Sequence, residues 1–205
     1  TYSLSVIGDN CAIDECIACN YLITNPPDLV INVVDASNLE RQLYLTAQLL
    51  EMQIPVVIAL NMMDMAKRRG IHIDIAQLSR SLHCPIISLT AIHGFGIAEL
   101  RRALLVIPQT NSTLPYSFAP LLQGALQTLT EKLAPKNLPR PWLALRLLEE
   151  DRLARHYTSA EELSHVTALI QQLKNQCGEE IDLLIADARY RWIQSILKPS
   201  LVVNP

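Results

Sequence analysis

The sequence lacks an excess of charge of either sign. Among its 205 residues, 17 Lys and Arg oppose 20 Asp and Glu, giving a formal net charge of -3, and only 18% of residues are charged. So weak a field gives no electrostatic footprint for a nucleic-acid backbone or an anionic membrane surface. We therefore expect no nucleic-acid partner.

Long apolar runs are also missing. The apolar stretches near 29–34 and 56–60 are far shorter than the roughly 20 residues that span a bilayer, so we expect no transmembrane helix within the chain. No charged region followed by an apolar region and a cleavage site marks a signal peptide. The five cysteines are odd in number and scattered, which favours reduced thiols in the cytosol over a disulfide framework.

Aromatic residues are scarce, at 5%, whereas half of all residues are hydrophobic. Aliphatic side chains must therefore build the core, and we do not expect disorder over most of the chain. The length gives room for one ordinary domain, or for a small domain with a helical appendage.

Strand and helix patterns alternate in the first half. A near-continuous β-branched run over 28–35 is typical of a parallel strand buried on both faces. Ser37 and Glu40 then form a capping-box pattern at the start of a helix. The same patterns predict strands over 55–60 and 85–89 and helices over 74–82, beginning at Asp74, and over 96–106. Repeated strand–helix units predict a parallel sheet with right-handed crossovers.

The composition changes at 108–115, a polar stretch bounded by prolines that indicates a linker. Beyond it the apolar residues follow helical spacing, with no strand alternation. The helices are predicted over 121–133, 142–153, 159–177 and 180–197, the third between a capping box of Ser159 with Glu162 and a stop at Gly178. The second half is therefore predicted to be all-helical.

An N-x-x-D pattern follows the predicted strand 55–60, at the edge of a parallel sheet where ligands bind. It consists of Asn61, Met62, Met63 and Asp64. An Asp carboxylate accepts two parallel hydrogen bonds from the ring N–H and exocyclic amine of guanine, a donor pair that adenine does not offer. The Asn amide can bond the purine N7 side and tie neighbouring loops. The alternative is an Asn in a turn and an Asp that caps a helix.

A second loop gives this pattern its context. The strand over 85–89 leads into Thr90, Ala91 and Ile92, small-residue backbone whose N–H groups can bond guanine O6. The order of strand, N-x-x-D, helix, strand, small-residue loop and helix is the order that a Ras-like guanine pocket requires. Together the two loops predict a guanine-binding site.

Several stretches resemble the cytosolic GTPase domain of the FeoB family of bacterial ferrous-iron transporters. The most specific are V-V-D-A-S-N-L-E-R over 33–41 and A-D-A-R-Y over 186–190. A-L-N-M-M-D over 59–64 and the segments 1–4 and 14–15 are similar to the same family's patterns. The resemblance covers nearly the whole chain.

The resemblance implies a Ras-like P-loop GTPase fold, an α/β fold of parallel sheet and flanking helices, followed by a helical domain compared to a dissociation inhibitor (GDI-like). It divides the chain into the C-terminal part of a G domain over 1–108, a linker over 109–117, the helical domain over 118–199 and a lead towards a membrane domain over 200–205. Asn61, Met62, Met63 and Asp64 match the fourth G motif, and Thr90, Ala91 and Ile92 match the fifth.

The implied function is guanine-nucleotide binding and slow hydrolysis, with GTP or GDP and Mg²⁺ as cofactors, in an intact protein that is a GTPase. Hydrolysis would gate Fe²⁺ uptake through a membrane-embedded domain C-terminal to this chain, at the cytoplasmic face of the bacterial inner membrane. The resemblance leaves the oligomeric state open, and a homo-oligomer is one of the partners considered. Met62 replaces the Lys that many GTPases carry, and its thioether stem can cover the base without a charge.

Phosphate-binding patterns are absent. The sequence contains no G-x-x-x-x-G-K-[ST], and the switch Thr and D-x-x-G are likewise not found. In the family, D-x-x-G comes immediately before a segment like 1–4, so the chain is expected to begin just inside the second switch. We assign no catalytic residue and no metal ligand, and we expect the Mg²⁺ ligands outside this sequence.

Other readings of the sequence stay open at this point. A ribosome-assembly GTPase would be expected to carry a basic appendage, whereas the charge of the second half is balanced. A nucleotide-free interaction module would fit a chain that is complete as given. A cysteine-based metal regulator would rely on Cys16 and Cys19, which have no second pair. We interpret the five histidines as surface or loop residues, Trp142 and Trp192 as core residues, and Arg189 as a structural contact to the G domain.

Overall fold

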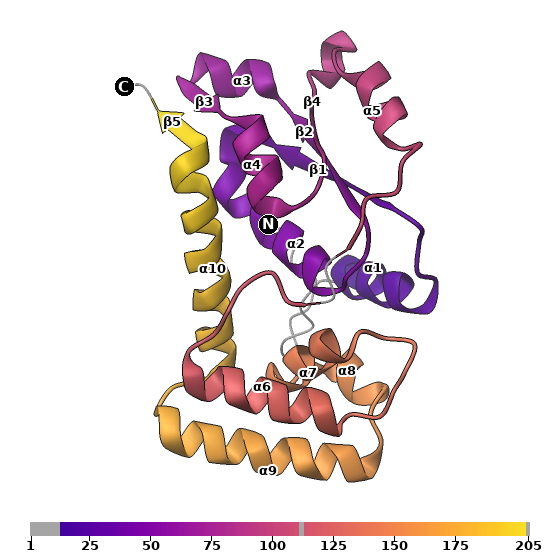
Figure 1. Cartoon of the computed structure of the whole chain (residues 1–205), viewed down its shortest axis with the longest axis vertical. Helices are drawn as coiled ribbons and strands as arrows, with labels where there is room; N and C mark the ends of the chain where they lie inside the picture. The colour runs from indigo at the N-terminus through magenta and orange to yellow at the C-terminus, as the bar shows by residue number, and fades with distance from the viewer. Residues whose placement is uncertain (1–12, 111–112, 204–205) are drawn as a thin grey trace.

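The computed structural model describes residues 13–110 and 113–203 (Figure 1). The family-like segment 1–4 and residues 111–112 of the predicted linker lie outside this part. The sheet half contains, in chain order, α1 (Ile13–Thr24), β1 (Val30–Asp35), the 3-10 turn η1 (Ala36–Asn38), α2 (Leu39–Glu51), β2 (Val56–Asn61), α3 (Met63–Arg68), β3 (Ile71–Ile73), α4 (Ile75–Leu82), β4 (Ile86–Ser88), the 3-10 turn η2 (Ala91–His93) and α5 (Ile97–Ala103). The helical half contains α6 (Pro120–Lys132), α7 (Arg140–Leu148), α8 (Arg152–His156), α9 (Ala160–Cys177) and α10 (Ile181–Ser200), followed by β5 (Leu201–Val203).

The sheet is parallel, with strand order β1-β2-β4. Val30 lies opposite Val56 at one end of the β1–β2 pair, and Asp35 lies opposite Asn61 at the other. The apolar residues of the central strand β2 are all buried, as its continuous apolar run predicts. The predicted parallel sheet with flanking helices, followed by a helical domain, is confirmed.

The prediction that the first strand is buried on both faces is wrong. Ile31 is 42% exposed and Val33 is 62% exposed, whereas Asn32 and Val34 are buried. Successive side chains point to opposite faces of a sheet, and α2 packs against β1. Among the described residues, β1 is an edge strand with one open face.

The start of α2 also differs from the prediction. The Asp35 carboxylate accepts a hydrogen bond from the Ser37 backbone N–H at 2.8 Å, which folds 36–38 into a 3-10 turn. The helix therefore begins at Leu39, after Asn38, and the expected Ser37–Glu40 capping box is wrong. The predicted Asp74 cap is confirmed, because its carboxylate accepts from the Gln77 N–H at 2.8 Å.

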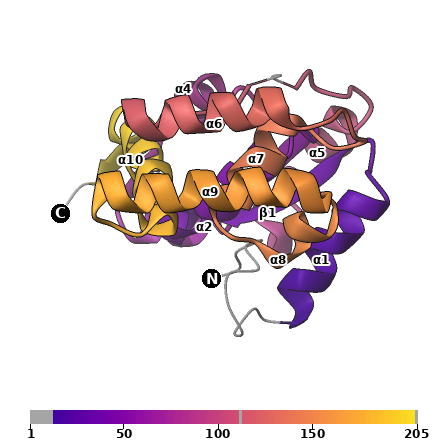
Figure 2. The same cartoon turned by 90° about the horizontal axis from the view of Figure 1, so that it is seen from below.

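The helical half lies below the sheet half in Figure 1, and Figure 2 shows α6 and α9 running side by side with α7 packed against both. The capping box of Ser159 and Glu162 is confirmed. The single helix predicted over 142–153 is wrong, because Glu150 takes a left-handed conformation (φ 57°). The Asp151 carboxylate then caps a separate α8 by accepting the N–H groups of 153 and 154.

The last helix reaches back to the sheet half. α10 packs against both α2 and α4 (Figure 1), and β5, which follows it, pairs antiparallel with β3. The prediction of an entirely helical second half missed β5, and the first half contains an unpredicted β3. One continuous core of buried residues extends through both halves.

No helix in the described part of the chain combines the length and the apolar character that crossing a membrane requires.

Candidate functional site

The N-x-x-D residues form a sharp strand-to-helix turn. β2 ends at Asn61, and α3 begins at Met63. Between them, Met62 takes the left-handed conformation, with φ 59° and ψ 34°. Such a backbone is uncommon for a side chain without a local hydrogen bond, and it costs on the order of 1 kcal/mol or more. This turn places Asp64 in the first turn of α3.

The Asn61 side chain joins two loops. Its Oδ1 accepts a hydrogen bond from the backbone N–H of Ala91 at 3.0 Å. The backbone supports the same contact, because the Met63 N–H donates to the Leu89 carbonyl at 3.3 Å. Two segments 30 residues apart in sequence are thus held against one another at the carboxyl edge of the sheet.

The second loop is closed on itself. The Thr90 N–H donates to the Phe95 carbonyl at 3.2 Å, and residues 91–93 form a 3-10 turn. Gly94 (φ 71°) and Gly96 (φ 80°) both take the left-handed conformation, which glycine adopts without steric cost. The shape of this loop is therefore set by its own hydrogen bonds and by the two left-handed glycines.

Gly96 is the position at which this loop tolerates no side chain. A Cβ there would lie 2.0 Å from the Ser88 carbonyl oxygen and 2.7 Å from Leu89 Cδ2. We expect Gly96→Ala to lower the free energy of unfolding by about 3 kcal/mol, because strain at positive φ and a backbone clash add. Urea unfolding followed by tryptophan fluorescence measures it.

Gly94→Ala is the matched control, because Gly94 has the same sign of φ and nothing within 4 Å of its Cβ position. This control should cost about 1 kcal/mol, the conformational part alone. Equal losses at the two positions would show that the contact with the Ser88 carbonyl does not matter.

Asp64 is the charged residue of the N-x-x-D segment and lies in the first turn of α3. Its side chain is half-buried, and its carboxylate makes no hydrogen bond or ion pair with any residue that the structure describes. Met62 is 47% exposed and Ile92 is 85% exposed. A carboxylate with unused acceptor capacity beside apolar side chains suits a planar ring that donates two hydrogen bonds.

The histidines and cysteines in the described part of the chain form no cluster that could bind a metal ion. In the ranges 13–110 and 113–203, no group of three His, Cys, Asp or Glu could hold a metal ion. The five histidines are exposed. Burial raises the pKa of the Cys19 thiol to about 11 and that of Cys84 to about 12, so both stay protonated at neutral pH and are poor ligands.

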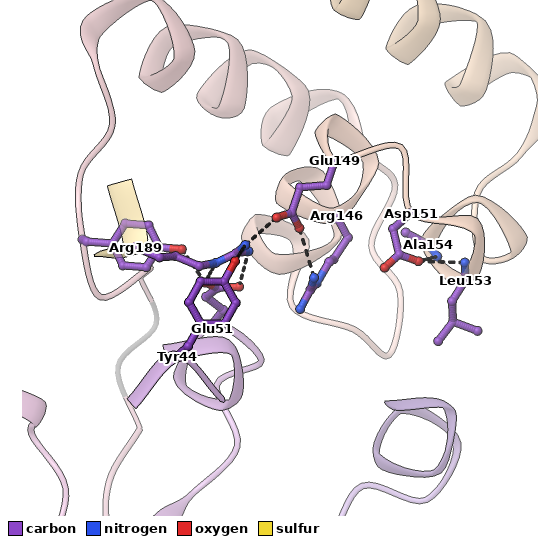
Figure 3. Close-up of polar contacts among 9 residues, drawn as sticks. Tyr44, Glu51, Arg146, Glu149, Asp151, Leu153, Ala154 and Arg189 are labelled. Carbon is purple, nitrogen blue, oxygen red and sulfur yellow. Dashed lines mark hydrogen bonds and ion pairs between the residues drawn. The ribbon is translucent and has the colours of Figure 1, made fainter. Parts of the chain in front are cut away.

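A buried ionic cluster joins the two halves (Figure 3). In it, Arg189 of α10 forms a bidentate pair with Glu51 of α2, at 2.6 Å from Nε to Oε1 and 3.0 Å from Nη2 to Oε2. Its Nη1 lies 2.5 Å from Oε1 of Glu149, whose other oxygen lies 3.1 Å from Nη1 of Arg146. The Tyr116 hydroxyl donates to Glu51. We call Glu51, Arg146, Glu149 and Arg189 the ionic cluster.

The ionic cluster balances two cations against two anions. Each of its four side chains is at most 1% exposed. Burial opposes the charge of Arg189, but Glu149 and Glu51 raise the pKa of Arg189 well above its usual value. Burial likewise opposes ionisation of Glu149, but Arg189 and Arg146 lower its pKa. The directions of these shifts keep Glu149 and Arg189 charged at neutral pH.

The predicted contact of Arg189 with the G domain is confirmed by its pair with Glu51. The sequence did not identify the other members of the cluster. The one sequence feature that indicates a buried charge is Arg146, which interrupts the apolar run W-L-A-L-R-L-L of α7. A charged residue inside such a run is expected to be buried and therefore paired. The confirmed core position of Trp142 lies in the same run.

Comparison with known proteins gives a consistent result. The family described as ferrous iron transport protein B matches residues 1–104, and the FeoB cytosolic helical domain matches residues 118–202. The Fe(2+) transporter FeoB of Escherichia coli K12 is 44% identical over 200 residues, which cover 96% of this chain and 25% of that protein. That of Salmonella typhimurium LT2 is 42% identical over the same shares. The chain thus spans a quarter of the length of these relatives.

Solved structures agree. The cytosolic domain of L. pneumophila FeoB has a TM-score of 0.81 at 36% identity, over 98% of this chain and 77% of that one. The S. thermophilus NFeoB bound to GDP.AlF4- and K⁺ has a TM-score of 0.83 at 29% identity, over 96% and 77%. A point mutant of the same protein bound to GDP has a TM-score of 0.86 at 28% identity, over 98% and 78%.

Proposed function

Since the chain belongs to the FeoB family of ferrous iron transport proteins, we propose that it is the guanine-nucleotide-binding regulatory part of a ferrous-iron transporter. In this proposal the sheet half reads the guanine base. The residues that do so are Asn61, Met62, Met63 and Asp64 in the first loop and Thr90, Ala91 and Ile92 in the second.

The observation that carries the proposal is the tie between the two loops. The 3.0 Å hydrogen bond from the Ala91 N–H to Asn61 Oδ1 holds the second loop beside the N-x-x-D segment by a contact within the protein. No residue in 13–110 or 113–203 occupies the acceptors of the Asp64 carboxylate, so we propose that it binds the ring N–H and exocyclic amine of guanine. Because the loops are already in place, little conformational entropy is lost on binding.

The phosphates and Mg²⁺ need other residues. The sequence contains no phosphate-binding motif, and we propose that these contacts come from a part of the protein outside this sequence. Bound Mg²⁺ would supply charge stabilisation for phosphoryl transfer from GTP to water. The GTPase reaction belongs to the intact protein, and this chain contributes base recognition and the link to the rest of the molecule.

We further propose the domain boundaries that the sequence predicts, with a G-domain part over 1–108, a linker over 109–117, a helical domain over 118–199 and a lead towards a membrane domain over 200–205. The relatives extend well beyond the matched part, which supports a membrane-embedded domain on the C-terminal side at the cytoplasmic face of the inner membrane. Family membership decides against a ribosome-assembly GTPase. A nucleotide-free interaction module is the remaining alternative.

The proposal is tested with the full-length protein in liposomes. We expect GTP on the side of the nucleotide-binding part to raise Fe²⁺ uptake at least threefold, because gating requires the bound nucleotide. An iron-quenched dye inside the vesicles measures uptake. ATP is the matched control, since adenine lacks the donor pair that Asp64 reads. Equal uptake with GTP, ATP and no nucleotide would favour the interaction module.

A further inference from the structure

The strand β5 returns the end of the described chain to the sheet half. Its residues pair with β3 in antiparallel register, with His72 opposite Val202 and Ile73 opposite Leu201. The Asp74 N–H extends the contact by donating to the Ser200 carbonyl at 2.9 Å. The residues that follow α10 therefore leave the helical half and contact the sheet half at β3 (Figure 1).

β3 is connected through α3 to the proposed base loop, by which we mean residues 61–64. It follows α3, the helix that carries Asp64, after a tight turn in which the Gly70 N–H donates to the Lys67 carbonyl at 3.1 Å. Ala66 anchors α3 because its side chain is completely buried. A displacement of α3 on binding a base would therefore be passed to β3 over fewer than ten residues of helix and turn.

α10 itself is held against α2 by contacts that do not involve the β3–β5 pair. Arg189 holds it to α2 through the ionic cluster, and Gln194 donates to Glu40 of α2 at 3.2 Å. Breaking a buried ion pair costs about 3–5 kcal/mol, so this contact stays formed. The β3–β5 pair has three residues in each strand, and β3 is only partly buried. Such a short pair is a low-stability element that can form and release.

We propose that the β3–β5 pair is the element that couples occupation of the base loop to the part of the protein that follows Val203. This inference rests on the proposed function of residues 61–64. Pairing holds β3 and thereby α3 in the position that binds guanine, and nucleotide binding in turn favours pairing. Coupling between two equilibria is reciprocal, so each must shift the other by the same factor.

The experiment uses full-length transporter in nanodiscs carrying His72→Cys with Val202→Cys. Residues directly opposite in an antiparallel pair lie about 4.5–5.5 Å apart, within reach of a disulfide. We expect oxidation to slow release of a fluorescent GDP analogue at least threefold, because the closed pair keeps α3 in place. Because coupling is reciprocal at equilibrium, saturating GDP should also shift the cross-link equilibrium in a glutathione redox buffer towards the disulfide.

The matched controls are the two single variants, His72→Cys and Val202→Cys, which undergo the same oxidation but cannot form the cross-link between β3 and β5. Oxidation of either single variant should change analogue release by less than 1.5-fold. Unchanged or faster release in the β3–β5 variant, or an equal effect in either control, would overturn the coupling. If the unsubstituted transporter does not bind the analogue at all, the proposed function fails instead, so the two failures are distinguishable.

Discussion

Replacing Arg189 by methionine should lower the free energy of unfolding by about 3–5 kcal/mol, the cost of removing one partner from a buried ion pair. Arg189 binds both Glu51 and Glu149. Without it, two buried carboxylates remain with Arg146 as the single nearby cation of the ionic cluster. Urea unfolding measures the loss, followed by the fluorescence of Trp192, which lies one turn along α10.

Arg191→Met is the matched control on the same helix. Arg191 pairs with Asp187, but its side chain is 68% exposed, and an exposed pair contributes at most about 1 kcal/mol. Equal losses for the two arginines would show that the ionic cluster does not hold the halves together.

A double substitution separates the lost pairing from the cost of an unpaired charge. Combining Glu51→Gln with Arg189→Met removes one anion as well as the cation, so the pair of substitutions should cost less than the sum of the two singles. Additive losses would contradict the direct Glu51–Arg189 interaction seen in Figure 3.

The pH dependence of the free energy of unfolding follows from the direction in which the pKa of Glu149 is shifted. Arg189 and Arg146 lower its pKa against the opposing effect of burial, so its contribution is complete above the unfolded value of about 4.3. The contribution is lost as the pH falls through the lower folded value. The arginine variants should therefore differ least from the unsubstituted protein in strong acid.

Asp64→Asn should weaken GDP binding to the intact transporter by at least about 30-fold, equivalent to about 2 kcal/mol. The carboxylate would be replaced by an amide, which has one acceptor oxygen and a donor that opposes the exocyclic amine of guanine. Xanthine carries an oxygen in place of that amine, so affinity for the xanthosine diphosphate should rise in the same variant. Titration with fluorescent analogues of the two nucleotides measures the exchange.

Asp74→Asn is the control for this substitution, because Asp74 also begins a helix of the sheet half but caps α4 with its carboxylate. An asparagine there keeps the cap and should leave both affinities unchanged. Unaltered GDP affinity in the Asp64 variant would exclude Asp64 as the group that reads the base.

The two loops proposed to bind the base, 61–64 and 90–92, show how much of the site could be predicted from local sequence. A strand that ends in N-x-x-D and a next strand that ends in small residues were enough to predict both segments, since parallel strands bring their carboxyl ends to one edge. The close approach of Gly96 to the Ser88 carbonyl and the left-handed conformation of Met62 could not be predicted in the same way. They depend on how closely β4 and the loop approach, which no residue pattern encodes.

The edge strand β1 and the η1 turn show where local patterns mislead. A β-branched run predicted burial on both faces, but burial depends on what packs against each face, and one face of β1 has no covering element in the described part of the chain. Ser37 and Glu40 have the spacing of a capping box, but the Asp35 carboxylate accepts a hydrogen bond from the Ser37 N–H instead. Ser37 therefore lies inside a 3-10 turn and does not cap the helix.

The shortage of long apolar runs predicted no membrane span within the sequence, the alternation of strand and helix patterns predicted an α/β half followed by a helical half, and the loop residues predicted a guanine site. These properties are local, because periodicity, caps and short motifs act over a few residues. The tertiary structure alone decided that Glu51 and Arg189, separated by 138 residues, share one buried ion pair. It also paired β3 with β5, since three-residue strands carry too little periodicity to be recognised and gain their hydrogen bonds only from distant partners.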